Sequence, residues 1–75
     1  MDEPVLIDVR GLKCPLPVLK AARRIQQHAA GTRFLLLATD PVAAIDVPHF
    51  CNEHGHRLIA SSREGAELRF EIEKG

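Results

Sequence analysis

A chain of 75 residues is long enough for one small core, and its ten basic residues balance ten acidic ones, so no overall charge favours nucleic acid or anionic lipid. Trp and Tyr are absent, which removes the usual platforms for base stacking. The first residues lack the regions of a signal peptide, and no apolar run is long enough to cross a bilayer. We therefore expect a single cytoplasmic domain over residues 1–75, with no membrane or direct nucleic-acid partner.

The first half of the chain predicts a strand, a helix and a strand. VLIDV (5–9) is a short β-rich run that ends at a turn, and residues 15–30 have helical spacing. One face of this helix is expected to hold Val18, Ala22, Ile25 and Ala29. Gly31 stands where a helix C-cap belongs, and the apolar run RFLLLAT (33–39) predicts a central strand.

A second helix is predicted after the dipeptide Asp-Pro at 40–41, which combines an N-cap residue with a first-turn proline. Pro48 is expected to interrupt it, since proline removes a helical hydrogen bond, although Asp46 could cap the helix again two residues earlier. We therefore predict a short turn, then a helix over residues 47–54 that ends at Gly55.

Two further strands are predicted at 57–61 (RLIAS) and 66–73 (AELRFEIE), joined by a hairpin connection over 61–65. The last strand alternates, with Ala66, Leu68, Phe70 and Ile72 inward. The order β-α-β-α-β-β predicts an α+β two-layer sandwich, a four-stranded mixed sheet with two helices on one face. A weak dimer through the uncovered sheet face is left open, although mainly a monomer is expected.

Cys14 stands directly in front of the sequence Pro-Leu-Pro. If the helix starts at Pro15, Cys14 is its N-cap, and the positive end of the helix dipole lowers the pKa of the thiol. Lys13 and Arg10 add nearby positive charge. Pro15 and Pro17 have no N–H to offer the sulfur, so we expect only a moderate lowering of the pKa.

Pro17 occupies the position at which a Cys-x-x-Cys redox motif has its second thiol. A persulfide or mixed disulfide on Cys14 therefore cannot be discharged by that neighbour. This property suits a carrier rather than a dithiol oxidoreductase. The alternative is purely structural, with Cys14 as a small residue at a helix start.

These residues carry a family resemblance. DVRGLKCPLPVLK (8–20) is similar to the CPxP signature of the TusA/SirA/YedF family of small sulfur carriers, in which Gly-x-x-Cys-Pro-x-Pro lies between a strand and a helix. DPVAAIDVPHFCNEHGH (40–56) resembles that family's Asp-Pro…Asp-Ile/Val-Pro…Phe-Cys…His segment. The resemblance extends from about residue 5 to the last strand. It implies a two-layer sandwich in which Cys14 accepts sulfane sulfur as a persulfide and passes it on, with the loop and helix start shaped by Gly11, Pro15 and Pro17.

The resemblance also implies partners. The donor would be a cysteine desulfurase or a rhodanese-like protein, and the acceptor would belong to 2-thiolation of tRNA wobble uridine, molybdenum-cofactor synthesis or sulfur oxidation. No metal or organic cofactor is implied. The activity would be that of a sulfurtransferase-type carrier rather than of a free-standing catalyst.

A candidate docking surface runs along the first helix. Basic residues follow one face, and the apolar Leu16 shares that face next to Cys14. The candidate residues are Arg10, Lys13, Leu16, Lys20, Arg23 and Arg24. The alternative is an ordinary solvated face with a lone exposed leucine.

Cys51 shares a helical stripe with Val47 and His54, so we expect it to be a buried core thiol, with a second reactive thiol as the alternative. The segment HFCNEHGH (49–56) contains three histidines, but their spacing does not match the usual zinc patterns and no metal is expected. Here His54 is expected to pack against the sheet.

Two other functions stay open. A non-catalytic RNA- or protein-binding module is compatible with a small α+β fold, although the balanced charge and missing aromatics count against RNA. A thiol-disulfide oxidoreductase would require the Cα atoms of Cys14 and Cys51 to lie within about 7 Å of each other.

Overall fold

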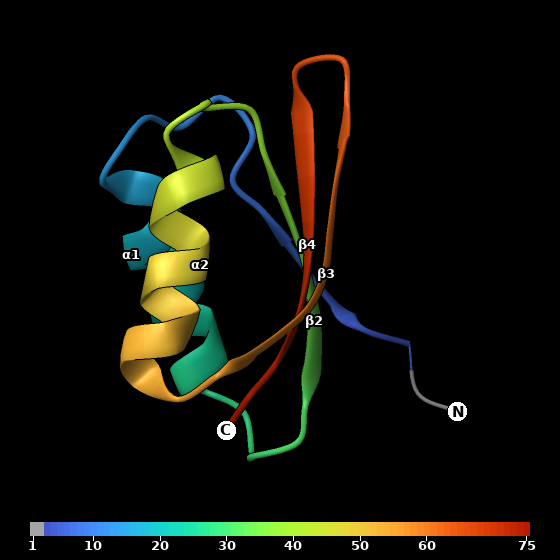
Figure 1. The fold of residues 1–75 in the computed structure, drawn as a ribbon. Helices are drawn as coiled ribbons and strands as arrows, with labels where there is room; N and C mark the ends of the chain where they lie inside the picture. Colours follow the sequence, from blue (N-terminus) through green and yellow to red (C-terminus); the bar gives the residue numbers. More distant parts are fainter. Residues whose placement is uncertain (1–2) are drawn as a thin grey trace.

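The computed structural model describes residues 3–75, and it shows one sheet with two helices against one of its faces (Figure 1). In chain order the elements are β1 (Val5–Asp8), α1 (Leu16–Gln26), β2 (Arg33–Ala38), α2 (Ala43–His54), β3 (Arg57–Glu64) and β4 (Glu67–Glu73). The predicted α+β two-layer sandwich is therefore confirmed. Neither helix of this described part is long and apolar enough to cross a membrane.

The sheet has the strand order β1-β2-β4-β3. β1 pairs in parallel with β2, whereas β2 and β3 both pair antiparallel with β4, so the sheet is mixed as predicted. β2 is an inner strand, which explains its nearly continuous apolar sequence. In its register with β4, Phe34 lies opposite Ile72, and Leu36 lies opposite Phe70.

The core fills the space between the helices and the inner face of the sheet. The alternation of β4 is confirmed for three of its four predicted inward residues, since Leu68, Phe70 and Ile72 are buried. Ala66 is instead exposed. The reason is that β3 continues to Glu64 and β4 starts at Glu67, so that Ala66 belongs to the tight turn of the hairpin.

On the outer face of the sheet, the leucines of β2 lie beside charged residues of β4. Leu35 and Leu37 alternate with the core residues of β2, and they lie opposite Glu71 and Arg69 of β4. Leu37 is only 8% exposed. Charged side chains with long apolar stems therefore stand beside this leucine pair, as the sequence allowed.

Helix α1 is shorter than the predicted range 15–30, and its buried face is rotated by about one residue. Its buried residues are Pro17, Ala21 and Ile25. Val18 and Ala22, which were predicted to share the apolar face with Ile25, are only half-buried. The helix ends early because the N–H of Gln27 donates to the Arg24 carbonyl at 3.1 Å, an i→i−3 bond that tightens the last turn.

The residues after α1 form a loop instead of a further helical turn. Ala29, predicted to be buried, is exposed in this loop. Gly31 has a φ of 89° and does not cap the helix. Its N–H donates to the Lys74 carbonyl at 2.8 Å, so this glycine connects the loop to the end of β4.

Helix α2 is continuous from Ala43 to His54, and the predicted break at Pro48 is wrong. Proline at this position removes one hydrogen bond, the one to the carbonyl four residues earlier, and that residue, Ala44, is exposed and accessible to water. The predicted N-cap is also wrong, because the helix begins at Ala43 and its N-cap is Val42, so that Asp40 and Pro41 lie in the turn before it. Asp40 accepts the Val42 N–H on Oδ1 at 3.1 Å and the Ala43 N–H on its carbonyl at 2.9 Å.

Gly55 ends α2 in the left-handed conformation, with a φ of 73°, which confirms the predicted C-cap.

Adjacent residues of β1 give a test of the core. Replacing Ile7, which is 1% exposed, with Ala should cost about 2–5 kcal/mol in the free energy of unfolding, because the core is left with a cavity. Urea unfolding followed by circular dichroism measures this cost. The control is Leu6→Ala, whose side chain is 53% exposed on the other face of the same strand and should cost only about 0.5 kcal/mol. Equal costs would contradict the assignment of the two faces.

Candidate functional site

Cys14 lies in the loop between β1 and α1. This loop lies at the end of the molecule where both helices begin (Figure 1). Gly11 shapes this loop with a φ of 83°, a conformation that favours glycine. The Gly11 N–H donates to Thr39 Oγ1 at 2.9 Å, and Thr39 directly follows β2. The loop is therefore attached to the segment that leads into α2.

Arg10 holds the start of the same loop. Its guanidinium pairs with Asp8 at 2.9 Å and with Glu67 at 3.1 Å, which connects the end of β1 to the start of β4. Hydrogen bonding to Arg10 lowers the pKa of Asp8 to about 2. Lys20 donates to the Asp8 carbonyl at 3.3 Å. These two predicted docking residues therefore make intramolecular contacts around Asp8.

The prediction that Cys14 is the N-cap of the first helix is wrong. The helix begins at Leu16 and its N-cap is Pro15, so Cys14 stands one residue further out. The N–H of Leu16, at the first position of the helix, donates to the Lys13 carbonyl at 2.9 Å.

Two carboxylates hold Cys14 in place. Its backbone N–H donates to Asp40 Oδ2 at 2.6 Å, and its Sγ lies 3.0 Å from Asp46 Oδ2. Asp40 lies between β2 and α2, and Asp46 belongs to the first turn of α2, where a negative charge complements the helix dipole. The reactive sulfur is therefore positioned by the second helix as much as by the first.

The pKa of the Cys14 thiol is raised, which contradicts the predicted lowering. The largest cause is the hydrogen bond to Asp46, followed by partial desolvation and the negative charges of Asp46 and Asp40. A carboxylate accepts the S–H hydrogen bond but repels a thiolate. The expected effect of the helix start is not among the causes of this shift.

The two cysteines differ strongly in accessibility. Both are free thiols; Cys14 is exposed, whereas Cys51 is only 2% exposed and packs in the core. Burial raises the pKa of the Cys51 thiol to about 11. The expectation that Cys51 is a buried core thiol is confirmed.

Exposed apolar side chains lie at the starts of both helices, at the same end of the molecule as the loop of Cys14. We call this group the thiol-end patch; it consists of Leu16, Leu19, Val42 and Ile45. Ile45 is 73% exposed and directly precedes Asp46. A shallow groove of about 230 Å³ runs from Pro15 and Asp46 between the two helices to His54. The site thus combines an accessible sulfur, a carboxylate and apolar surface.

The remaining predicted docking residues lie at different distances from the thiol. Lys13 is exposed and adjacent to Cys14 in the chain. Arg23 and Arg24 belong to the last turn of α1, where they complement the helix dipole. Arg23 is seven residues beyond Leu16, roughly 10 Å along the helix.

Several residues of this site were not predicted from the sequence. Asp40 and Asp46 were interpreted only as helix caps, although both lie in the second motif of the family resemblance. Leu19 and Ile45 carried no signal, because nothing in a single sequence shows that two helix starts share one surface.

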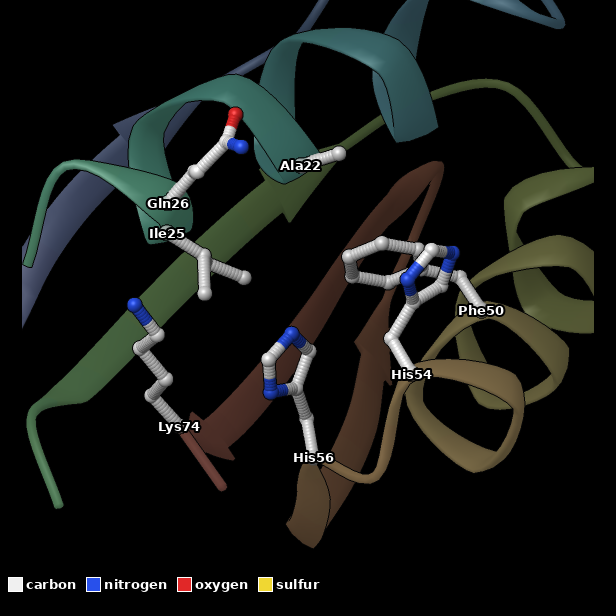
Figure 2. A pocket seen from close by; sticks show the side chains of 7 residues that line it. All are labelled: Ala22, Ile25, Gln26, Phe50, His54, His56 and Lys74. Atoms are coloured by element: carbon white, nitrogen blue, oxygen red, sulfur yellow. The ribbon is translucent and has the colours of Figure 1, made fainter. Parts of the chain in front are cut away.

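A second hollow, of about 270 Å³, lies at the other end of the helices (Figure 2). His54 and His56 of the predicted histidine cluster line it together with Lys74 and Phe50. His54 is exposed, and its ring centroid lies 4.9 Å from that of Phe50. The prediction that His54 packs against the sheet is therefore wrong. Burial, His54 and Lys74 lower the pKa of His56.

The histidines do not converge on one point. His49 pairs with Glu53 at 2.7 Å on the surface of α2, away from the core thiol Cys51. Within residues 3–75, no three His, Cys, Asp or Glu side chains are grouped so that they could hold a metal ion.

The fold and the site define a small α+β protein with one accessible, positioned thiol. The family model of the sulfurtransferase TusA matches residues 5–74, almost the whole chain, and the chain belongs to this family. Membership supports a general role as a sulfur-carrier sulfurtransferase that interacts with sulfur donor and acceptor proteins.

The difference between the two thiols predicts selective labelling. Iodoacetamide at about pH 8 should add one adduct to the folded protein, at Cys14, because only that sulfur is reachable. In urea a second adduct should form on Cys51. Mass spectrometry counts the adducts, and Cys14→Ser should remain unlabelled while folded. Labelling of both thiols at one rate in the folded protein would contradict the structure.

Proposed function

We propose that this protein accepts sulfane sulfur as a persulfide on Cys14 and relays it to an acceptor protein. The observation that carries this proposal is the single exposed thiol, at the matching position of the CPxP motif, in a chain that belongs to the TusA family.

The arrangement of the thiols supports a carrier. Pro17 occupies the position of a resolving cysteine, and it is buried in α1. Cys51 belongs to α2 and lies on the buried face of this helix, in the core. Neither position gives Cys14 an accessible internal partner, so a persulfide there is kept until another molecule attacks it. The same arrangement counts against the thiol-disulfide oxidoreductase alternative.

The thiol-end patch supports transfer between proteins. Interfaces commonly have an apolar centre and a polar rim, and here exposed apolar side chains flank the sulfur while Lys13 and Asp46 supply charges. Donor and acceptor would occupy this surface in turn, because each must reach the same sulfur. Arg23 and Arg24 extend the candidate surface along α1.

The donor would be a cysteine desulfurase or a rhodanese-like protein. The acceptor would belong to tRNA thiolation, molybdenum-cofactor synthesis or a related sulfur pathway, and the site favours none of these. Two free thiols in so small a protein are typical of a reducing compartment, which supports a cytoplasmic location.

Loading with sulfur tests the function directly. Incubation with a cysteine desulfurase and cysteine should add the mass of one sulfur atom to the protein, and the added sulfur should map to Cys14. Cys51→Ser should load like the wild type, since the core thiol takes no part, and Cys14→Ser should gain no sulfur. Loading that persists in Cys14→Ser would overturn the proposal.

Docking through the thiol-end patch predicts a second outcome. Ile45→Ser should weaken binding of the desulfurase by about 1 kcal/mol or more, roughly fivefold in affinity, because the variant loses apolar contact. Titration calorimetry measures this affinity. Leu6→Ser removes a comparably exposed side chain from β1 and should leave the affinity unchanged. Equal effects of the two substitutions would exclude the patch as the docking surface.

A further inference from the structure

We propose that Asp46 keeps unloaded Cys14 as a neutral thiol, and that a sulfur donor releases this thiol by placing a basic side chain against the Asp46 carboxylate. This inference rests on the proposed carrier function and deepens it. It assigns a catalytic residue beside the reacting sulfur, and it states the charge that the donor must present.

The geometry gives Asp46 control over the sulfur. Its Oδ2 atom lies 3.0 Å from Cys14 Sγ, and a carboxylate can only accept a hydrogen bond, so the sulfur must be the donor. A thiolate could not make this bond and would face a negative charge at the same distance. The contact therefore favours the protonated sulfur.

The Asp46 carboxylate is also available to a partner. Among the ion pairs within residues 3–75, acidic partners are Asp8, Glu53, Glu67 and Glu73. Asp46 forms no such pair in this part of the chain. A carboxylate has about four acceptor sites, so oxygen lone pairs remain for a cation besides the bond to Cys14. Exclusion of water by the adjoining thiol-end patch would strengthen the new ion pair.

The other charged groups near Cys14 are less able to respond. Asp40, from the segment before α2, accepts the backbone N–H groups of Cys14 and Val42, and these bonds lower its pKa. It therefore stays charged and structurally engaged. Lys13 is adjacent in the chain and adds to the lowering of the Asp40 pKa. Asp46 remains the group whose neutralisation would act directly on the sulfur.

The loading reaction balances without an oxidant or a reductant. The Cys14 sulfur forms a bond to the outer sulfur of the donor persulfide, and the donor S–S bond breaks. The donor cysteine leaves with the electron pair of that bond and takes up the proton that Cys14 gives up. One persulfide and one thiol thus yield one thiol and one persulfide. The attacking species is the thiolate, which a docked cation would make available.

This control would separate the donor from other electrophiles. Small oxidants and alkylating agents bring no cation to Asp46, so they meet the neutral and less reactive thiol. A protein donor reacts with the thiolate, because a basic side chain of the donor compensates the negative charge of the Asp46 carboxylate. The carrier would then be reactive mainly inside the complex.

The first experiment measures the rate of alkylation of Cys14 by iodoacetamide as a function of pH. Asp46→Asn should move the profile to lower pH. In the range below the thiol pKa, the rate should rise about threefold for every tenfold gain in ionisation, since greater ionisation is partly offset by weaker nucleophilicity. Asp46→Glu keeps the charge and should stay close to the wild type. Circular dichroism confirms that the variants are folded.

A matched control removes the same charge elsewhere on α2. Glu53 is seven residues beyond Asp46, roughly 10 Å along the helix, and it pairs with His49. Glu53→Gln should leave the pH profile unchanged. If Asp46→Asn also left the profile unchanged, Asp46 would not control the thiol and the proposal would be overturned.

The second experiment compares two sulfur donors. Asp46→Asn should accelerate loading by inorganic polysulfide, which brings no basic side chain. It should not accelerate loading by a cysteine desulfurase supplied with cysteine, which already neutralises the carboxylate in the wild type. Equal acceleration with both donors would overturn release by the donor. Failure of the wild type to load at all would instead overturn the carrier function, while the iodoacetamide profile would still decide whether Asp46 controls the thiol.

Discussion

The parallel pairing of β1 with β2 is the constraint on which the site depends. Their register runs from Val5 opposite Phe34 to Asp8 opposite Leu37, so both strands end at the same edge of the sheet. The segments that follow them therefore leave the sheet side by side. Cys14 follows β1 and Asp46 follows β2, and 32 positions of sequence become a contact of 3.0 Å. A different pairing would leave the thiol without its carboxylate.

This contact changes how the reactive sulfur is controlled. Near a helix start, the expected influence on a thiol is the partial positive charge of the dipole, which falls off within the first turn. Cys14 stands just outside that turn, and its backbone N–H and its Sγ contact the carboxylates of Asp40 and Asp46. The charges that raise the pKa of this thiol therefore come from α2 and from the segment before it. A sulfur that is exposed but held as a thiol can be accessible without being indiscriminately reactive.

The core contributes by keeping the other thiol away. Cys51 packs on the buried side of α2, and the continuity of this helix through Pro48 fixes both its buried and its exposed faces. The same helix therefore places Asp46 beside the exposed Cys14 and Cys51 in the interior. Separation of the two thiols and control of the exposed one have a common structural origin.

Local patterns were sufficient to predict the element order, the inner strand β2 and the buried Cys51, because each depends on short-range periodicity or on the polarity of single residues. The predictions were wrong where tertiary contacts overrode local preferences. Pro48 is tolerated inside α2, and Ala29 lies in a loop after an early helix end. The contact between Cys14 and Asp46 could not be predicted, because the pairing and register of the strands cannot be derived from the local pattern of one sequence. The helical spacing around Cys51 was enough to predict which of the two sulfur atoms lies in the core. The direction of the pKa shift of Cys14 could not be predicted in the same way, because it depends on the carboxylates that strand pairing brings near the sulfur.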